Sequence, residues 1–415
     1  MMQNVYDTLK ARGFIENVTD DDAVKALLNE PRVCYTGFDP TGESLHVGHL
    51  LPIMALMHME RAGHKPIALL GGGTAMIGDP SGKTEMRQMI TAETIEANKE
   101  AMKRQIGRYL DLEGGKSLVL DNARWLLPLN YIEFLREIGR HFSVNRMLAA
   151  EAYKQRLERG LSFIEFNYQI LQAFDFLTLY RSHGCLLQMG GNDQWGNILA
   201  GEDLVRRLEG KEVHAFTYPL LTTADGKKMG KTEKGAVWLS AEKLSPYEYF
   251  QFWRNVEDSQ VIKLLKLFTF LPLDEIAEME EWTDSRINDA KERLAYEATV
   301  ITHGEEEARK ALEATKAVFA GAGASSEALP GTEVTEEELR ERNWDAASFL
   351  AELGFSPSKS EAKRLIKQGG VSFNGEKISD FAMAVTAACF DDNRECLIKM
   401  GKKTFFKVVL TSGGG

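Results

Sequence analysis

The first half of the chain alternates short apolar runs with longer stretches in which apolar residues recur every three or four positions. Short runs bounded by turn residues are typical of buried strands, and the longer spacing is typical of amphipathic helices. We predict strands at Val33–Phe38, Ile67–Leu70, Leu118–Leu120 and Leu186–Met189. Because helical stretches separate these runs, we expect an α/β fold with a parallel sheet, in which ligands bind at the carboxyl ends of the strands.

The second half of the chain begins as helix and then changes character. Residues 244–320 have helical spacing nearly throughout, and a stretch rich in Gly, Ala and Ser follows as a predicted linker. Beyond it, Lys359–Lys367 predicts an amphipathic helix, and Val371–Ile378 predicts a hairpin with a type I′ turn. We therefore expect a first domain, a helical domain, a linker and a small last domain, at residues 1–232, 233–320, 321–344 and 345–411.

Charge sets the last segment apart from the rest. The 415 residues carry a formal net charge of -11, which argues against non-specific nucleic-acid binding over the whole surface. From Asp345 to Gly415 there are ten Lys or Arg and eight Asp or Glu, so this segment is +2 and residues 1–344 are -13. The asymmetry suggests a tail module with a partner of its own.

Composition also limits the location of the protein. No apolar run is long enough to span a bilayer, and the N-terminal residues do not form a secretory signal. The four cysteines form no CxxC pair and no ligand cluster. We therefore expect a cytoplasmic protein without membrane contact, disulfide framework or metal site.

The segment Pro40–Leu50 follows a predicted strand and opens a predicted helix. It places His46 and His49 in the first helical turn, with Gly48 between them. Free backbone N–H groups and the positive end of the helix dipole suit that turn to polyphosphate, and the imidazoles can add donors. Gly48 would leave room for a flat group such as a purine. The alternative is an ordinary helix start with two satisfied histidines.

In a second segment, Asp225–Thr232, one lysine precedes and another follows a Met-Gly step. Its glycines allow a tight loop, and Lys228 and Lys231 are point charges suited to phosphate. Taken alone, the segment is weak evidence, because lysine-rich surface loops are common and a solvated loop is the simpler interpretation.

A third pattern lies in the apolar helix that contains Phe166–Asp175. Tyr168, Gln172 and Asp175 are spaced i, i+4, i+7 and share one helix face. Polar groups on an otherwise apolar helix need partners if they are buried, so this stripe is either a binding surface or a solvent face.

Together these segments resemble the HIGH and KMSKS signatures of class I aminoacyl-tRNA synthetases, in the right order along an α/β domain. Val47, Gly230 and Thr232 depart from the usual residues, and the last two resemble the tyrosyl subgroup. The resemblance implies a Rossmann-like catalytic domain that uses ATP with Mg²⁺. It also implies that Thr41 and His46 grip the leaving pyrophosphate. The catalytic residues implied are Thr41, His46, His49, Lys228, Lys231 and Thr232.

The polar stripe resembles the tyrosine-binding helix of bacterial tyrosyl-tRNA synthetases. That likeness implies that Asp175 and Tyr35 contact the substrate phenol. Further tyrosine contacts are implied for Asp79, Tyr168, Gln172, Gln188 and Gln194. ATP contacts are implied for Gly37, Asp39, His46, Gly48, His49, Gly191, Asp193 and Lys231. The family often has Ser where Asn192 stands, which leaves a hydroxyl role there in doubt.

Two further segments fit the same family. Gly78–Thr84 has one residue too few between its glycines for a Walker A loop and resembles the family's Asp-Pro-Ser-Gly-Lys loop. Lys83 and Arg87 are candidates there for contacts to phosphate or to the acceptor end of the tRNA. The tail resembles an S4 RNA-binding domain. That resemblance implies tRNA contacts from its basic helix, through Lys359, Lys363, Arg364 and Lys367.

The family resemblance covers residues 3–411 and implies attachment of L-tyrosine to tRNA(Tyr) through a tyrosyl-adenylate. It also implies a homodimer, with Tyr131–Ala150 contributing to the interface. Two alternatives remain. The sister enzyme for tryptophan shares both signatures but has no reason for an acceptor at Asp175. A non-catalytic RNA-binding relative would usually lack some of the histidines and lysines of the signatures, and this chain retains all of them.

Overall fold

The computed structural model describes residues 4–412, except 82–89, 150–152, 154–156, 158–159, 223–228, 233–234, 283, 321–328, 330 and 402–403. The chain forms two compact units, each made of two stretches of sequence. Met1–Lys243 and Val256–Leu294 make the first unit, and Leu244–Asn255 and Ala295–Gly415 make the second. The predicted helical domain is therefore shared between the two units.

A six-stranded sheet forms the centre of the first unit, with strand order β1-β6-β5-β2-β3-β4. Its strands are β1 (Asn17–Val18), β2 (Val33–Phe38), β3 (Lys65–Leu70), β4 (Leu118–Asp121), β5 (Cys185–Gly191) and β6 (His214–Tyr218). The four predicted strands are present, and β2 to β6 pair in parallel. The predicted parallel sheet is confirmed, and it carries one further strand at its edge, because β1 pairs antiparallel to β6. A two-residue strand is too short to show a spacing pattern.

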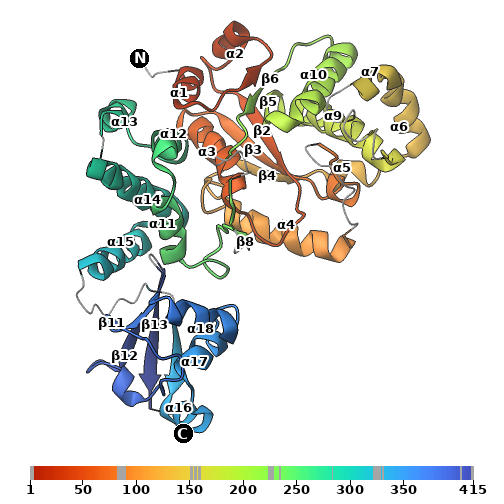
Figure 1. Cartoon of the computed structure of the whole chain (residues 1–415). Helices are drawn as coiled ribbons and strands as arrows, with labels where there is room; N and C mark the ends of the chain where they lie inside the picture. The colour runs from red at the N-terminus through yellow and green to blue at the C-terminus, as the bar shows by residue number, and fades with distance from the viewer. Residues whose placement is uncertain are drawn as a thin grey trace. The chain divides into compact units, whose positions relative to one another are not determined.

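Helices cover both sides of this sheet. In Figure 1, α3 lies to the left of the strands, whereas α9 and α10 lie to their right. The helices of the first unit are α1 (Val5–Arg12), α2 (Asp21–Leu27), α3 (Val47–Arg61), α4 (Ala92–Ile106), α5 (Ala123–Leu126), α6 (Tyr131–Glu137), α7 (Val144–Ala149), α9 (Phe163–His183), α10 (Trp195–Glu209), α12 (Val261–Phe268) and α13 (Leu273–Glu280). Residues Tyr35 and Leu69 of the sheet pack with Phe176 of α9 in one apolar cluster.

The ends of α9 are encoded locally. Ser162 and Glu165 form a capping box at its start, which satisfies two backbone N–H groups. Gly184 ends the helix with a φ of 63°, in the left-handed region that favours glycine. Between these signals the helix runs for 21 residues, long enough to carry the whole polar stripe past the sheet.

The second unit contains helices and a smaller sheet. Its helices are α11 (Pro246–Arg254), α15 (Glu305–Ala320), α16 (Glu336–Arg342), α17 (Ala346–Glu352) and α18 (Lys359–Lys367), and α14 (Ile287–His303) continues into it from the first unit. The prediction of helix over most of residues 244–320 is confirmed. Tyr249 and Thr302 share a hydrogen bond of 3.0 Å that joins α11 to α14.

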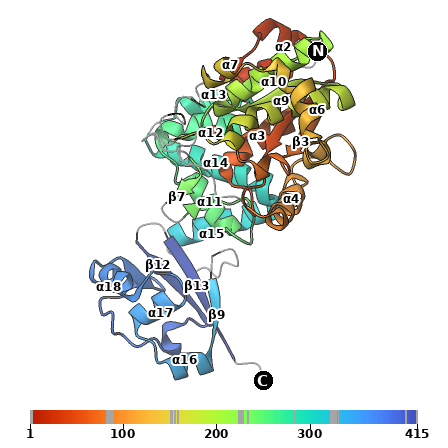
Figure 2. The ribbon, with the colours of Figure 1, turned by 90° about the vertical axis from the view of Figure 1, so that its right-hand side faces the viewer.

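The small sheet has strand order β11-β10-β12-β13-β9. Its strands are β9 (Gly331–Thr335), β10 (Val371–Phe373), β11 (Glu376–Lys377), β12 (Glu395–Met400) and β13 (Thr404–Thr411). Figure 2 shows this sheet with α17 and α18, and residues of both helices and of the strands form one apolar cluster. Asn374 and Gly375 have positive φ angles of 46° and 86°, which confirms the type I′ hairpin.

Residues 331–342 fall within the predicted linker but form β9 and α16. Val334 and Leu339 are buried in the apolar cluster of the small sheet, and β9 pairs in parallel with β13. The long separation in sequence between these two strands explains why the spacing pattern did not reveal the pairing. The small domain therefore includes a strand and a helix that precede its predicted start at residue 345.

Candidate active site

A cavity of about 450 Å³ opens at the carboxyl ends of the central strands. Its lining combines the ends of β2, β3 and β5, the start of α3 and one face of α9. This is the edge at which open α/β sheets bind ligands, and the volume is that of a small-molecule site. The predicted site residues that line it are Tyr35, Gly37, Asp39, Thr41, His46, Gly48, His49, Asp79, Tyr168, Gln172, Asp175, Gln188, Gly191, Asp193 and Gln194.

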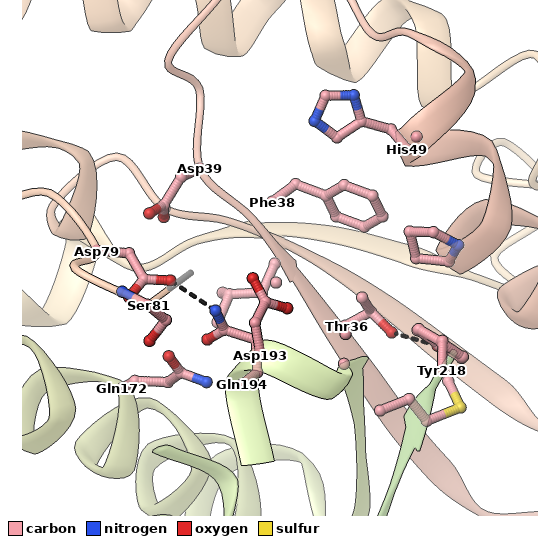
Figure 3. A pocket seen from close by; sticks show the side chains of 18 of the residues that line it. Thr36, Phe38, Asp39, His49, Asp79, Ser81, Gln172, Asp193, Gln194 and Tyr218 are labelled. Atoms are coloured by element: carbon pink, nitrogen blue, oxygen red, sulfur yellow. Dashed lines mark hydrogen bonds between the residues drawn. The ribbon is translucent and has the colours of Figure 1, made fainter. Parts of the chain in front are cut away.

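Carboxylates and amides gather on one side of this pocket. Figure 3 shows Asp39, Asp79, Gln172 and Gln194 together, with His49 on the opposite side. Gln194 Nε2 donates to Asp79 at 2.6 Å, and the backbone N–H of Ser81 donates to the same carboxylate at 2.8 Å. Burial raises the pKa of Asp79 to about 6, even though these hydrogen bonds favour its ionised form.

Tyr168 has a hydrogen-bond partner within the protein. Its hydroxyl donates to Asp39 Oδ2 at 2.9 Å, which links the helix stripe to the end of β2. Gln172 accepts from Asn197 Nδ2 at 3.0 Å through its side-chain oxygen. Both residues line the pocket with Asp175, so the interpretation of the stripe as a solvent face is wrong.

Asp175 lies at the deep end of the stripe and is 3% exposed. Its carboxylate accepts from Trp125 Nε1 at 2.7 Å and from Asn122 Nδ2 at 2.9 Å. Burial raises the pKa of Asp175 to about 7, and these two donors oppose that rise. A buried carboxylate that remains partly ionised at neutral pH is well suited to accept a hydrogen bond from a ligand.

Two buried polar atoms in this pocket lack partners among the described residues. The Tyr35 hydroxyl and the side-chain oxygen of Gln188 have no hydrogen bond there, and the two residues are 1% and 3% exposed. Native proteins rarely leave such atoms unpaired. Both residues line the same cavity as Asp175, so a polar ligand in that cavity would satisfy them.

Sequence reasoning missed Asn122, Thr74 and Trp125. Asn122 Nδ2 is also 3.0 Å from Thr74 Oγ1, and Thr74 in turn donates to Asp39 at 2.8 Å. A continuous chain of hydrogen bonds therefore runs from Asp175 to Asp39. Asn122 directly follows β4, so the rule that polar residues after parallel strands face the binding edge could have identified it.

The predicted helix start is confirmed, but its backbone donors are not free. His46 is the N-cap of α3, its Nδ1 accepts from the N–H of Gly48 at 3.0 Å, and His49 Nδ1 accepts from the N–H of His46 at 3.2 Å. The N–H of Val47 donates to Val237 O at 2.9 Å. The expectation that these N–H groups are open to phosphate was therefore wrong, because the chain itself occupies them.

The hydrogen bonds at this turn define the tautomer of each imidazole. Since each Nδ1 accepts a hydrogen bond, the neutral ring must carry its proton on Nε2. The pKa of His49 is lowered to about 3, mainly by burial and to a smaller extent by the nearby His46, so that ring is neutral. A Cβ on residue 48 would lie 2.8 Å from the His46 ring, so Gly48 also makes room for this histidine.

The segment after the second signature pairs with the first signature. Leu239 donates to Leu45 O at 2.9 Å, and Gly230 has a φ of 97° where a Cβ would lie 3.3 Å from the N–H nitrogen of Gly48. Lys231–Thr232 form the short strand β7, paired with β8 (Gly235–Ala236). Their side chains lie outside the described part of the chain, as do Lys83, Arg87 and Lys228 entirely.

Asn192 and Asp193 begin a short 3₁₀ helix at the end of β5. Asp193 lines the pocket, whereas the Asn192 side chain is not part of the lining and accepts a hydrogen bond from Asn17 Nδ2 at 2.5 Å. The doubt over a direct role for this side chain is therefore consistent with its placement.

The described residues include no group of three or more His, Cys, Asp or Glu side chains that could hold a metal ion. Within the same part of the chain, no helix is long and apolar enough to cross a membrane. All four cysteines are free thiols.

The basic residues predicted for tRNA contact lie on α18. Lys359 forms an ion pair with Asp345 at 2.9 Å, and Arg364 forms one with Glu361 at 2.5 Å. Lys363 and Lys367 both lie over the ring of Phe381, at 5.1 and 5.2 Å from its centre. The helix thus presents a basic surface held partly by acidic neighbours and partly by an aromatic ring.

Comparison with known proteins agrees with this geometry. Residues 27–320 match the family of class I tRNA synthetases for tryptophan and tyrosine (W and Y), and residues 326–408 match the SYY-like C-terminal domain of tyrosine–tRNA ligases. The chain is 54% identical to the tyrosine–tRNA ligase of Acetivibrio thermocellus, over 99% of this chain and 100% of that one. It is 51% identical to the corresponding ligase of Clostridium tetani, over the same shares.

Solved structures give the same result. A C-terminally truncated mitochondrial tyrosyl-tRNA synthetase from Aspergillus nidulans superposes with a TM-score of 0.68 at 32% identity, covering 76% of this chain and 94% of that one. A tryptophanyl-tRNA synthetase from Encephalitozoon cuniculi shares the fold at 15% identity, with a TM-score of 0.56 and coverage of 74% of this chain and 89% of that one. The Rossmann-like expectation for the first domain is confirmed. The chain belongs to the class I tRNA synthetases and, within them, to the family of tyrosine–tRNA ligases.

Proposed function

We propose that this chain attaches L-tyrosine to tRNA(Tyr) in two steps within the pocket described above. The tyrosine carboxylate attacks the α-phosphate of ATP, which gives tyrosyl-adenylate and releases pyrophosphate. The terminal adenosine of the tRNA then takes the tyrosyl group, and AMP leaves. The observation that carries the proposal is a buried carboxylate, Asp175, in one cavity with His46, His49 and the Tyr35 hydroxyl, which has no hydrogen bond among the described residues.

The deep end of the pocket would recognise the phenol. The phenol O–H would donate to the Asp175 carboxylate, and its oxygen would accept from the Tyr35 hydroxyl. Phenylalanine would leave the Tyr35 hydroxyl without a ligand acceptor and would give the Asp175 carboxylate no donor from the ligand, which costs binding free energy. Asp79 would hold the substrate ammonium, together with Gln172 and with Tyr168, whose hydroxyl is oriented by Asp39. Gln188 and Gln194 would complete the contacts to the amino acid.

The rest of the pocket would hold ATP. Gly37, Asp39, Gly48, Gly191 and Asp193 lie where a nucleoside can contact the strand ends. The substrate carboxylate is itself the nucleophile, so the protein needs no side-chain nucleophile. Catalysis would then consist of positioning the two reactants and stabilising the negative charge that grows on the phosphates.

The phosphate contacts would come from both signatures. His46 and His49 would donate from Nε2, and Thr41 would donate from its hydroxyl. Lys228, Lys231 and Thr232 would add contacts from the second signature. Because the described residues form no cluster of metal ligands, we propose that Mg²⁺ enters with the phosphates of ATP, whose oxygens it prefers.

The tRNA and a second subunit would use other surfaces. Lys359, Lys363, Arg364 and Lys367 of α18 would contact tRNA phosphates. Helix α6 has no buried residue, and Tyr131, Ile132 and Leu135 are 58%, 69% and 38% exposed. Apolar side chains gathered on one helix are typical of an interface, so we propose that this region, with the predicted range Tyr131–Ala150, forms a homodimer contact.

A charging assay tests the proposal. Purified chain, ATP, Mg²⁺ and a bacterial tRNA(Tyr) transcript should give tyrosyl-tRNA when tyrosine is supplied and none when tryptophan replaces it. A transcript charged with tryptophan, or charged with neither amino acid while ATP remains intact, would contradict the proposed function.

A further inference from the structure

Helix α4 holds both ends of the turn that joins β2 to α3. Asn98 Nδ2 donates to Pro40 O at 3.0 Å at the start of the turn. At its end, the side-chain oxygen of Gln105 accepts from the N–H of Leu45 and the hydroxyl of Ser44, both at 3.1 Å. The orientation of both amides is fixed by chemistry, because a carbonyl oxygen can only accept and a backbone N–H can only donate.

The two amides are built into the fold. Asn98 and Gln105 are seven residues apart on α4, so they lie on one face of the helix. They are 6% and 8% exposed, and Ser44 is 2% exposed. Buried hydrogen bonds of this kind resist displacement, because breaking one leaves a desolvated polar group unpaired.

The middle of the turn is different. Thr41 is exposed and lines the active-site cavity, and its backbone N–H donates to Asp39 O at 2.8 Å. His46, the next lining residue along the chain, directly follows Leu45. The hydrogen bonds to α4 therefore hold the residues immediately before Thr41 and immediately before His46.

We propose that Asn98 and Gln105 are positioning residues for the adenylation step, holding Thr41 and His46 at the places from which they contact the departing pyrophosphate. The inference rests on the proposed function and adds to it two residues that touch neither substrate. Loss of either tie lets the turn shift, and small displacements of groups that stabilise a transition state are costly in rate. The tyrosine side of the pocket receives none of these contacts, so tyrosine affinity stays unchanged.

Two substitutions of Gln105 separate hydrogen bonding from packing. Gln105→Met keeps the shape of the side chain and removes the acceptor, so the single-turnover rate of adenylate formation should fall about 10- to 100-fold. Gln105→Glu keeps an oxygen in the same place and should remain within about threefold of wild type. The tyrosine dissociation constant, measured without ATP, should stay the same in both variants.

Asn98→Asp provides an independent check, and it matters if the methionine variant fails to fold. It preserves the size of the side chain but replaces the donor with an oxygen that faces Pro40 O, so it should cause the same selective fall in rate. Glu100→Met places a methionine on the exposed side of α4 and is the matched control, with wild-type rate expected.

The outcomes separate the two proposals. A wild-type chain without tyrosine-dependent adenylate formation would overturn the proposed function and the positioning role with it. Active wild type with an unaffected Gln105→Met or Asn98→Asp would overturn the positioning role alone. The positioning role is also overturned if Gln105→Glu is as slow as Gln105→Met, or if tyrosine affinity falls in parallel with the rate. Either result indicates a general structural defect.

Discussion

Replacing Trp125 with phenylalanine should shift the pH dependence of tyrosine binding. Trp125 Nε1 donates to Asp175 at 2.7 Å, and this hydrogen bond favours the ionised carboxylate. Asp175 has a pKa of about 7, raised mainly by burial. Trp125→Phe retains an aromatic ring and removes the donor, so the pKa of Asp175 should rise further.

The size of the change follows from the strength of that bond. A hydrogen bond to a charged group contributes about 1.5–3 kcal/mol. At about 1.4 kcal/mol per pH unit, its loss raises the pKa of Asp175 by about one to two units, to about 8–9. A carboxyl with a raised pKa is protonated below that pKa and then no longer offers both oxygens to the phenol. At pH 7.5 the variant should therefore bind tyrosine about 3- to 25-fold more weakly than wild type, and the difference should shrink as the pH rises.

Equilibrium dialysis with radiolabelled tyrosine between pH 6 and 8.5 measures this effect. Trp282→Phe, which alters a tryptophan outside the pocket lining, is the control and should follow the wild-type curve. A Trp125→Phe curve that overlays wild type, or one displaced towards lower pH, would refute the assigned role of this hydrogen bond.

Three further predictions concern other parts of the molecule. His46→Ala should slow adenylate formation about 100- to 1000-fold without weakening tyrosine binding. His46→Asn restores a helix cap but not the Nε2–H donor, so it should not recover the rate. Recovery would show that the loss came from the missing cap. A chain ending at Ala320 should form adenylate at the normal rate and charge tRNA poorly, and full charging would exclude the small domain from tRNA binding. Ile132→Asp should give monomers by sedimentation, because it places a charge in the proposed interface, and an unchanged dimer would place the interface elsewhere.

The sequence was informative where local periodicity determines on which face of an element a side chain lies. The 3.6-residue helical repeat places Tyr168, Gln172 and Asp175 on one face whatever the rest of the fold does, and the structure finds all three in one pocket. The type I′ turn at Asn374 was equally predictable, because its geometry demands residues that tolerate positive φ.

The remainder depends on contacts between distant segments. Asn122 and Trp125 hold Asp175 from about 50 positions away, and they do so only because β4 lies beside β3 in the sheet. The N–H of Val47 is occupied by Val237, a residue 190 positions later, so the helix start could not be assessed from its own sequence. Neither arrangement produces a periodic signal.

Tyrosine-dependent exchange between ATP and pyrophosphate is the most direct test of the central claim that the Asp175 pocket selects tyrosine for activation. Wild type, assayed with each standard amino acid, should exchange label with tyrosine and with neither phenylalanine nor tryptophan, and Asp175→Ala should lose the tyrosine reaction. Exchange driven by tryptophan, or wild-type exchange with tyrosine in Asp175→Ala, would contradict the account.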